Sequence, residues 1–116
     1  MKRTAWAAAL VAAPVLFWAA ISAHAADKLP KAVAVGKSYD AARITLKGYK
    51  PAPNAASRTE FCAFAAEACA TYPEVENCAG TGKGQCLMVW TKAGKRLTIV
   101  TAFDDPKVID SITRGP

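Results

Sequence analysis

Histidine is nearly missing from this sequence, because the 116 residues contain only one, His24. It lies in an N-terminal stretch that we expect to be removed, so the folded domain would carry no imidazole. Triad hydrolases need an imidazole as general base, and many metal sites use imidazole ligands. The absence excludes both kinds of chemistry from the expected domain.

Cysteine motifs for zinc are missing as well. The four cysteines are separated by six, eight and seven residues, and none of them forms a C-x-x-C pair. Zinc sites built from cysteines usually contain such closely spaced pairs. We therefore expect no metal ion and no other cofactor.

The glycine-rich stretch CAGTGKGQC, residues 78–86, lacks the features of a phosphate-binding loop. Gly84 follows Lys83 where a Walker loop needs Ser or Thr, and Asn77 stands where its first glycine belongs. The dinucleotide fingerprint fails because Gln85 replaces its third glycine. The basic residues are spread along the chain with acids between them, which favours a solvated surface and no nucleic-acid partner.

The N-terminus has the pattern of a secretory signal peptide. Lys2 and Arg3 precede an uncharged run from residue 5 to residue 21, and Ala23 and Ala25 supply an A-x-A cleavage site. The alternative is an uncleaved anchor, since the run is close to the length that spans a bilayer, but Pro14 interrupts it. Cleavage after residue 25 would leave 91 residues, whose formal charge is +4 where the whole chain has +6. We expect this mature protein in the periplasm or outside the cell, without insertion into the membrane.

An even number of cysteines in an exported small domain predicts two disulfides. The glycine-rich stretch reads as the turn of a β-hairpin, and directly opposed strand residues lie within disulfide reach, so we pair Cys78 with Cys86. Cys62 and Cys69 remain, but residues seven apart in one unbroken helix stand about 10 Å apart. Either the helix breaks before Cys69, or the cysteines pair differently, for example Cys62 with Cys78.

The pattern predicts an α+β domain of two N-terminal helices on a three- to four-stranded antiparallel sheet. After a flexible leader over residues 26–37, a helix begins at the N-cap Ser38 and ends at Gly48, with Ile44 on its apolar side. A second helix begins near Thr59, capped by Thr59 or Ser57, and carries Phe61, Phe64, Ala65 and Ala68 at helical spacing. Strands are expected over residues 74–78, 85–90 and 96–103, with a short strand or turn at 107–112. One domain is thus expected over residues 38–116.

Two pairs of acids are the remaining candidates for chemistry. Glu74 and Glu76 point to the same side of the expected strand, and Asp104 and Asp105 precede Pro106. Two carboxylates could serve a glycosidase. A solvated strand face and a turn explain them more simply, and Trp90 is expected to pack in the core or at an edge, as is Phe103.

Two stretches together resemble a group of small exported bacterial proteins of uncharacterised function. VGKSYDAARITLKGYKP matches a G-x-S/T-Y-x-x-A-R helix, and YPEVENCAGTGKGQCLMVW matches a PE-x-x-x-C-x-G-T-G-x-x-x-C-x-x-x-W hairpin. The resemblance covers most of residues 36–101 and implies a disulfide between Cys78 and Cys86 and an exported location, but no activity. At the level of architecture, the expected fold is similar to SmpA/OmlA lipoproteins and to β-lactamase inhibitory proteins, although the lipid-attachment cysteine of the former is missing.

These observations favour a non-enzymatic interaction module of the bacterial cell envelope, which binds a protein through one sheet face. A carboxylate-dependent enzyme acting on cell-wall glycan is the alternative. The candidate contact loop is the tip of the hairpin, formed by Gly80, Thr81, Gly82, Lys83 and Gly84.

Overall fold

The computed structural model describes residues 28–80, 82, 84–102 and 107–116. The expected signal peptide, Thr81 and Lys83 of the hairpin tip, and Phe103, Asp104 and Asp105 lie outside these residues. The fold is α+β, with a five-stranded antiparallel sheet and two disulfides. The prediction of an α+β fold with an antiparallel sheet is confirmed, but the sheet has one strand more than expected.

β3 (Cys86–Lys92) is the central strand of the sheet. Along one edge it pairs first with β2 (Val75–Cys78) and then with the two-residue β1 (Lys50–Pro51), which the sequence did not predict. Along its other edge it pairs with β4 (Lys95–Ala102), which pairs with β5 (Val108–Gly115). β5 is a full edge strand of eight residues instead of the short element expected.

The β3–β4 connection is a two-residue turn, because Lys92 pairs with Lys95. Ala93 and Gly94 both have positive φ, 52° and 78°, as the type I′ hairpin turn requires. Glycine adopts this conformation freely, whereas the side chain of Ala93 is crowded in it.

The first helix, α2 (Tyr39–Arg43), begins at Ser38 as predicted, where the Ser38 side chain accepts a hydrogen bond from the Ala41 amide. It is shorter than predicted, since it ends at Arg43, and the chain continues in turns to Gly48, whose φ is +84°. Ile44 was expected on the apolar side and is instead 72% exposed, because it follows the last residue of the helix.

The second predicted helix is two helices. α3 (Ala55–Cys62) begins at the N-cap Asn54, so the prediction of a start near Thr59 is wrong; Asn54 accepts a hydrogen bond from the Ser57 amide and caps the helix earlier. α4 (Ala66–Thr71) follows after a break. Phe64 lies in that break and is 93% exposed, contrary to its expected place on an apolar helix face.

The break decides the disulfide connectivity. It lets the chain fold back, so that the Cα atoms of Cys62 and Cys69 are 5.8 Å apart and the two residues form a disulfide. Cys78 and Cys86 form the second disulfide, directly opposed in the β2–β3 ladder with Cα atoms 3.9 Å apart. Cys78–Cys86 is the pairing that we expected, and the break in the helix resolves the alternative left open for Cys62 in favour of Cys69 and against Cys78.

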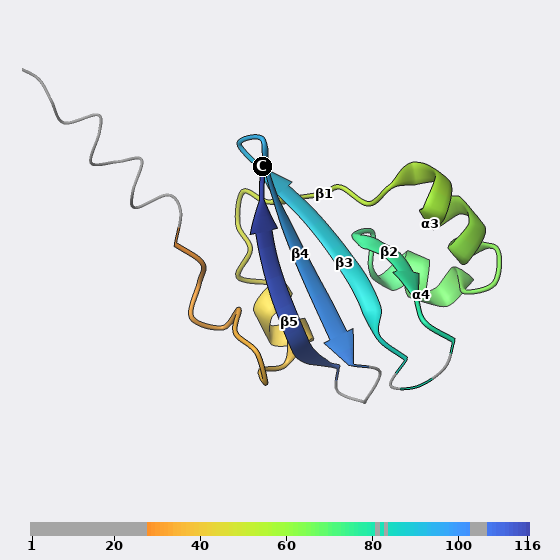
Figure 1. Ribbon diagram of the computed structural model, residues 1–116, viewed down its shortest axis with the longest axis horizontal. Helices are drawn as coiled ribbons and strands as arrows, with labels where there is room; N and C mark the ends of the chain where they lie inside the picture. Colours follow the sequence, from red (N-terminus) through yellow and green to blue (C-terminus); the bar gives the residue numbers. More distant parts are fainter. Residues whose placement is uncertain (1–27, 81, 83, 103–106) are drawn as a thin grey trace, which may run out of the picture.

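The core lies between α2 and one face of the sheet. Alternate residues of the strands, such as Met88, Trp90, Leu97 and Ile99, are buried against Tyr39 and the residues around it. Figure 1 shows α2 (gold) behind β4 and β5, with α3 and α4 beyond β2 at the side of the sheet. No helix among the described residues covers the opposite face.

The described part of the flexible leader expected over residues 26–37 is residues 28–37, and it joins the fold. Val33 is buried in the core, and the chain runs beside the beginning of β5, where the Gly36 amide donates to the carbonyl of Ile109. The Ile109 amide donates in turn to the carbonyl of Lys37. The segment therefore packs along part of the β5 edge and is not a flexible leader there.

Candidate functional site

Glu74, directly before β2, is the most unusual polar residue of the domain because its side chain is fully buried. Its Oε2 accepts hydrogen bonds from Tyr39 Oη at 2.6 Å and from Arg43 Nε at 2.8 Å. Its Oε1 accepts from Arg43 Nη2 at 2.9 Å. The interpretation of Glu74 as part of a solvated strand face is wrong, since α2 places a cation and a hydroxyl donor over it and so compensates its burial.

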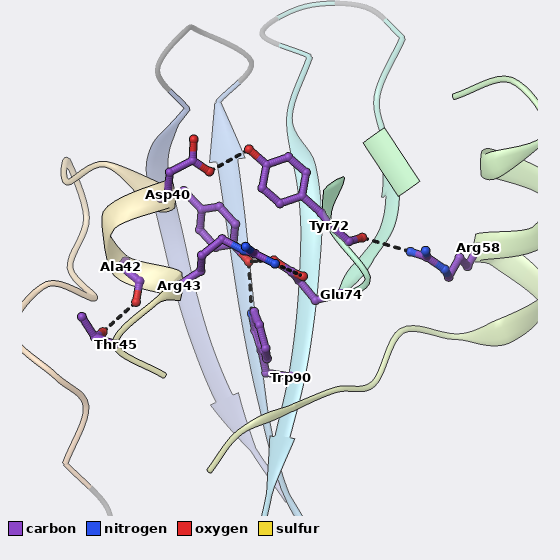
Figure 2. Close-up of polar contacts among 9 residues, drawn as sticks. Asp40, Ala42, Arg43, Thr45, Arg58, Tyr72, Glu74 and Trp90 are labelled. Carbon is purple, nitrogen blue, oxygen red and sulfur yellow. Dashed lines mark hydrogen bonds and ion pairs between the residues drawn. The ribbon is translucent and has the colours of Figure 1, made fainter. Parts of the chain in front are cut away.

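Trp90 extends this arrangement from the sheet. Its Nε1 donates to Tyr39 Oη at 3.1 Å, so the tyrosine hydroxyl accepts from Trp90 and donates to Glu74. Figure 2 shows Glu74, Arg43 and Trp90 converging between α2 and the sheet. We call Tyr39, Arg43, Glu74 and Trp90 the buried network. It joins two segments that are distant in the sequence, residues 39–43 and 74–90, and the expectation that Trp90 packs in the core is confirmed.

The protonation states of the donors follow from this geometry. Burial, together with the charge of Glu74 and the hydrogen bond to it, raises the pKa of Tyr39 far above its usual value, so its hydroxyl stays a donor. The hydrogen bond to Glu74 is also the main reason that the pKa of Arg43 is raised, and the guanidinium stays charged. Both oxygens of Glu74 are thus occupied by permanent donors and are withdrawn from solvent.

Tyr72 packs over the network from the segment before β2. Its ring centroid is 5.9 Å from that of Tyr39, and Arg43 Cζ lies 5.1 Å above the ring of Tyr72. Its hydroxyl donates to Asp40 Oδ1 at 2.7 Å, as Figure 2 shows. Burial, followed by this hydrogen bond, raises the pKa of Tyr72 to about 12.

Glu76 has different surroundings from Glu74. It is half-buried, and its Oε1 accepts a hydrogen bond from the amide of Asn54 at 2.6 Å, at the start of α3. Glu74 therefore binds α2 and Glu76 binds the start of α3, and each carboxylate has a separate structural partner. The structure does not show the two as a free carboxylate pair.

Arg58 of α3 is a residue that the sequence analysis missed. Its Nη1 donates to the carbonyls of Val75 at 2.7 Å and Tyr72 at 3.2 Å, and its Nη2 donates to the carbonyl of Cys69 at 3.0 Å. The guanidinium thus connects the end of α4 to the beginning of β2. Its positive charge also compensates the negative C-terminal end of the α4 dipole. An arginine inside an alanine-rich helix gives no sequence signal for this role.

The base of the predicted contact loop is well defined. The Ala79 amide donates to the carbonyl of Gln85 at 2.7 Å and continues the hairpin beyond the disulfide. Gly82 and Gly84 have positive φ, 66° and 61°, as the hairpin interpretation required, whereas Gly80 is not among the residues with positive φ.

An apolar recess lies beside this loop. Its volume is about 210 Å³, and its walls come from α3, α4, the β2–β3 hairpin and the first residue before β5. The lining includes Phe61, Ala68, Val75, Met88, the Cys78–Cys86 disulfide and Lys107. The base of the loop contributes Ala79 and Gly80, so the recess and the candidate contact loop form one continuous surface.

Comparison with protein-family models, with curated proteins and with solved structures gives no match for this chain. Among the residues that the structure describes, no group of three or more Cys, His, Asp or Glu side chains lies close enough together to hold a metal ion. The helices of the same ranges are all too short or too polar to cross a bilayer.

Proposed function

We propose that this chain is an exported interaction module of the bacterial cell envelope, periplasmic or secreted, which binds a protein partner and has no enzymatic activity. The observation that carries the proposal is the apolar recess beside the disulfide-closed hairpin. The two disulfides support an oxidising compartment, where such bonds form and persist.

The dimensions of the recess favour a protein partner. Sites for small molecules usually enclose about 300–1,000 Å³, whereas this recess of about 210 Å³ suits a single apolar side chain. Its walls are fixed by the Cys78–Cys86 disulfide and by the three hydrogen bonds of Arg58. A rigid apolar recess that takes one anchor residue is the usual centre of a protein interface.

The alternative of a glycan-cleaving enzyme would need Glu74 or Glu76 to reach a substrate. A general acid must lie within hydrogen-bond reach of the leaving group. Glu74 is fully buried with both oxygens occupied by Tyr39 and Arg43, so it has no route to a bound sugar without unfolding the network. This geometry favours the interaction module over the enzyme.

The export part of the proposal is tested by the intact mass of the protein purified from whole cells and from the medium. A mass that begins at Ala26 and is four hydrogens below the reduced value supports cleavage and two disulfides. A mass that retains the first 25 residues overturns the claim that the protein is released from the membrane.

The binding surface is tested with paired substitutions on α4. Ala68 lines the recess, whereas Ala70 on the same helix is exposed and does not. We expect Ala68→Trp to abolish affinity capture of the partner from envelope extracts, and Ala70→Trp to leave it intact, with both variants folded as judged by thermal unfolding.

A third variant, Thr98→Arg, probes the sheet face opposite α2. Loss of the partner in Thr98→Arg and not in Ala68→Trp would move the binding surface to the sheet and refute the recess. Failure to capture any partner, together with turnover of an envelope glycan by the wild-type protein, would overturn the interaction module itself.

A further inference from the structure

Phe64, in the break between α3 and α4, is the most exposed large apolar side chain of the described residues, at 93%. Its backbone is nevertheless fixed. The Phe64 amide donates to the carbonyl of Phe61 at 3.0 Å, and the Cys62–Cys69 disulfide closes the loop around it. Figure 1 shows the break at the end of the α3–α4 segment that points away from the sheet. The fold therefore holds an aromatic ring in water on a rigid support, as an anchor residue of a protein interface requires.

Phe64 stands next to the apolar recess of the proposed function but does not line it. Phe61 before it and Ala65 after it both form walls of the recess. Since Phe64 is almost fully in water, its ring lies outside the recess of its own chain. One short segment thus presents an aromatic projection and an apolar recess side by side.

The recess suits a phenyl ring in size and in chemistry. Its volume is about 210 Å³, and an apolar cavity of about 150 Å³ is enough to bind benzene. The lining includes the thioether of Met88, and such sulfur atoms make favourable contacts with aromatic rings. Phe61 and Tyr72 also line the recess, so an entering ring meets other rings at its walls. An aromatic side chain is therefore a better occupant than an aliphatic one.

The charges around the projection and around the recess have opposite signs. Glu60 and Glu67, near Phe64 in the chain, are exposed acids. The described lining of the recess contains Lys107 and no Asp or Glu. Lys107 keeps its place over the ring of Tyr72, 5.7 Å from the centroid, and still makes the potential at the rim positive. The acids beside the projection of one copy thus complement the recess of another.

We propose that two copies of this chain form a symmetric dimer in which Phe64 of each copy fills the recess of the other. A two-fold axis pairs a surface with itself, so a patch that carries both the projection and the recess makes the same contact twice. Burial of two phenylalanine side chains removes about 300–500 Å² from water. The exposed residues Ala63 and Ala66 beside Phe64 are small and let the two segments approach closely.

The buried area sets the strength of this dimer. A stable interface buries about 1,200–2,000 Å², of which the two rings supply about a quarter. The dimer therefore belongs among the small, reversible interfaces. It covers the apolar recess of both copies while no other protein is bound.

This inference rests on the recess of the proposed function and names a second copy as its occupant in the absence of another partner. An envelope protein that inserts its own anchor residue competes with Phe64 for the same recess. Removal of Phe64 should then leave the recess open to that partner.

Sedimentation equilibrium of the oxidised protein at increasing concentrations measures the association. We expect a monomer–dimer equilibrium with a Kd of about 1–100 µM. Phe64→Ala should weaken the dimer about a hundredfold or more, because each dimer loses two anchor contacts. Ile44→Ala is the matched control, since Ile44 is 72% exposed but does not line the recess. Its exchange should change the Kd less than about twofold.

A mixture of two variants tests the reciprocal contact. Ala68→Trp fills the recess and keeps Phe64, whereas Phe64→Ala keeps the recess and lacks the projection. Neither variant should dimerise alone. An equimolar mixture should form a heterodimer, because Phe64 of the first variant can enter the recess of the second. Thermal unfolding checks that both variants are folded.

Several results would overturn the dimer. They are a wild-type protein that stays monomeric well above this concentration range, an equal loss of association in Phe64→Ala and Ile44→Ala, and a mixture that stays monomeric. Oligomers larger than a dimer would overturn it as well, because they indicate a head-to-tail contact that does not close.

The failure of this inference is distinguishable from the failure of the proposed function. If the wild type is monomeric and Ala68→Trp abolishes capture of the envelope partner, the recess binds that partner and no second copy. If the wild type dimerises through Phe64 and neither it nor Phe64→Ala captures a partner, the dimer stands and the binding of another protein is refuted.

Discussion

The exchange of Glu74 for glutamine tests the buried network most directly. Glutamine has nearly the same shape as glutamate but carries no charge, and its amide group is a donor. In the folded protein it would face Tyr39 Oη and two nitrogens of Arg43, all of which are donors. The variant thus loses an ion pair and places a donor against other donors.

The expected cost follows from burial. Removing one partner of a buried ion pair costs about 3–5 kcal/mol, because the other charge is left without compensation. The Arg43 side chain is 26% exposed and water can hydrate part of it, so we expect the lower end, about 3 kcal/mol. A domain of this size is stable by about 5–15 kcal/mol, so Glu74→Gln remains folded but is severely weakened.

Urea unfolding of the oxidised protein without its first 25 residues measures this cost. Trp90 is then the only tryptophan, and it donates to Tyr39 within the network, so its fluorescence reports the relevant region. We expect a lower midpoint with an unchanged slope, and a melting temperature lower by about 10–20 °C.

Glu76→Gln is the matched control. Glu76 is half-buried and accepts one backbone hydrogen bond, so its exchange should cost less than about 1 kcal/mol. The double variant Arg43→Met/Glu74→Gln should lose less unfolding free energy than the two single variants lose together, and the difference should be at least about 1 kcal/mol. If Glu74→Gln costs no more than Glu76→Gln, or stabilises the domain, the network does not stabilise the fold. Glu74 would then again be a candidate for a catalytic carboxylate.

Three further predictions concern other parts of the fold. Ala93→Asn should stabilise the domain by about 0.5–1 kcal/mol in urea unfolding, because asparagine followed by Gly94 tolerates the positive φ of the type I′ turn. Arg58→Lys should cost about 1–2 kcal/mol in the same assay, since the guanidinium reaches the three carbonyls from two separate nitrogens, whereas lysine carries all its donors on one nitrogen. The free energy of unfolding should also fall between about pH 10 and pH 12. The pKa of Tyr72 is about 12 in the folded state, against 10.0 for an unperturbed tyrosine. Above about pH 10 the unfolded chain therefore releases a proton that the folded chain keeps. Urea midpoints across this range should drop less in Tyr72→Phe, with a residual fall from Tyr39, whose pKa burial also raises.

Each of these predictions has an outcome that contradicts it. A destabilised Ala93→Asn would mean that the turn does not require positive φ at that residue. An Arg58→Lys variant as stable as the wild type would show that water replaces the lost contacts without cost. Urea midpoints that are flat above pH 10 would show that the two tyrosine hydroxyls ionise as readily in the folded protein as in the unfolded chain.

Local signals in the sequence predicted local features well. The Ser38 cap depends on a side chain and an amide three residues apart, and the hairpin around Cys78 and Cys86 depends on glycines between two short strands. The alternation of Leu97, Ile99 and Thr101 reflects a strand with one buried face. The break between α3 and α4 was only one of two alternatives left by the cysteine spacing, because Ala65, before α4, provides no side-chain cap and leaves no local sign of a new helix.

The amino-acid sequence by itself thus determined the antiparallel hairpins, the first helix cap and the pairing of Cys78 with Cys86, since each rests on residues that are close along the chain. Only the tertiary structure decided that Glu74 is buried, because its partners Tyr39 and Arg43 are 35 and 31 residues away. A charged side chain has no fixed role until packing sets its distance from other charges and from water, and that distance is a property of the fold.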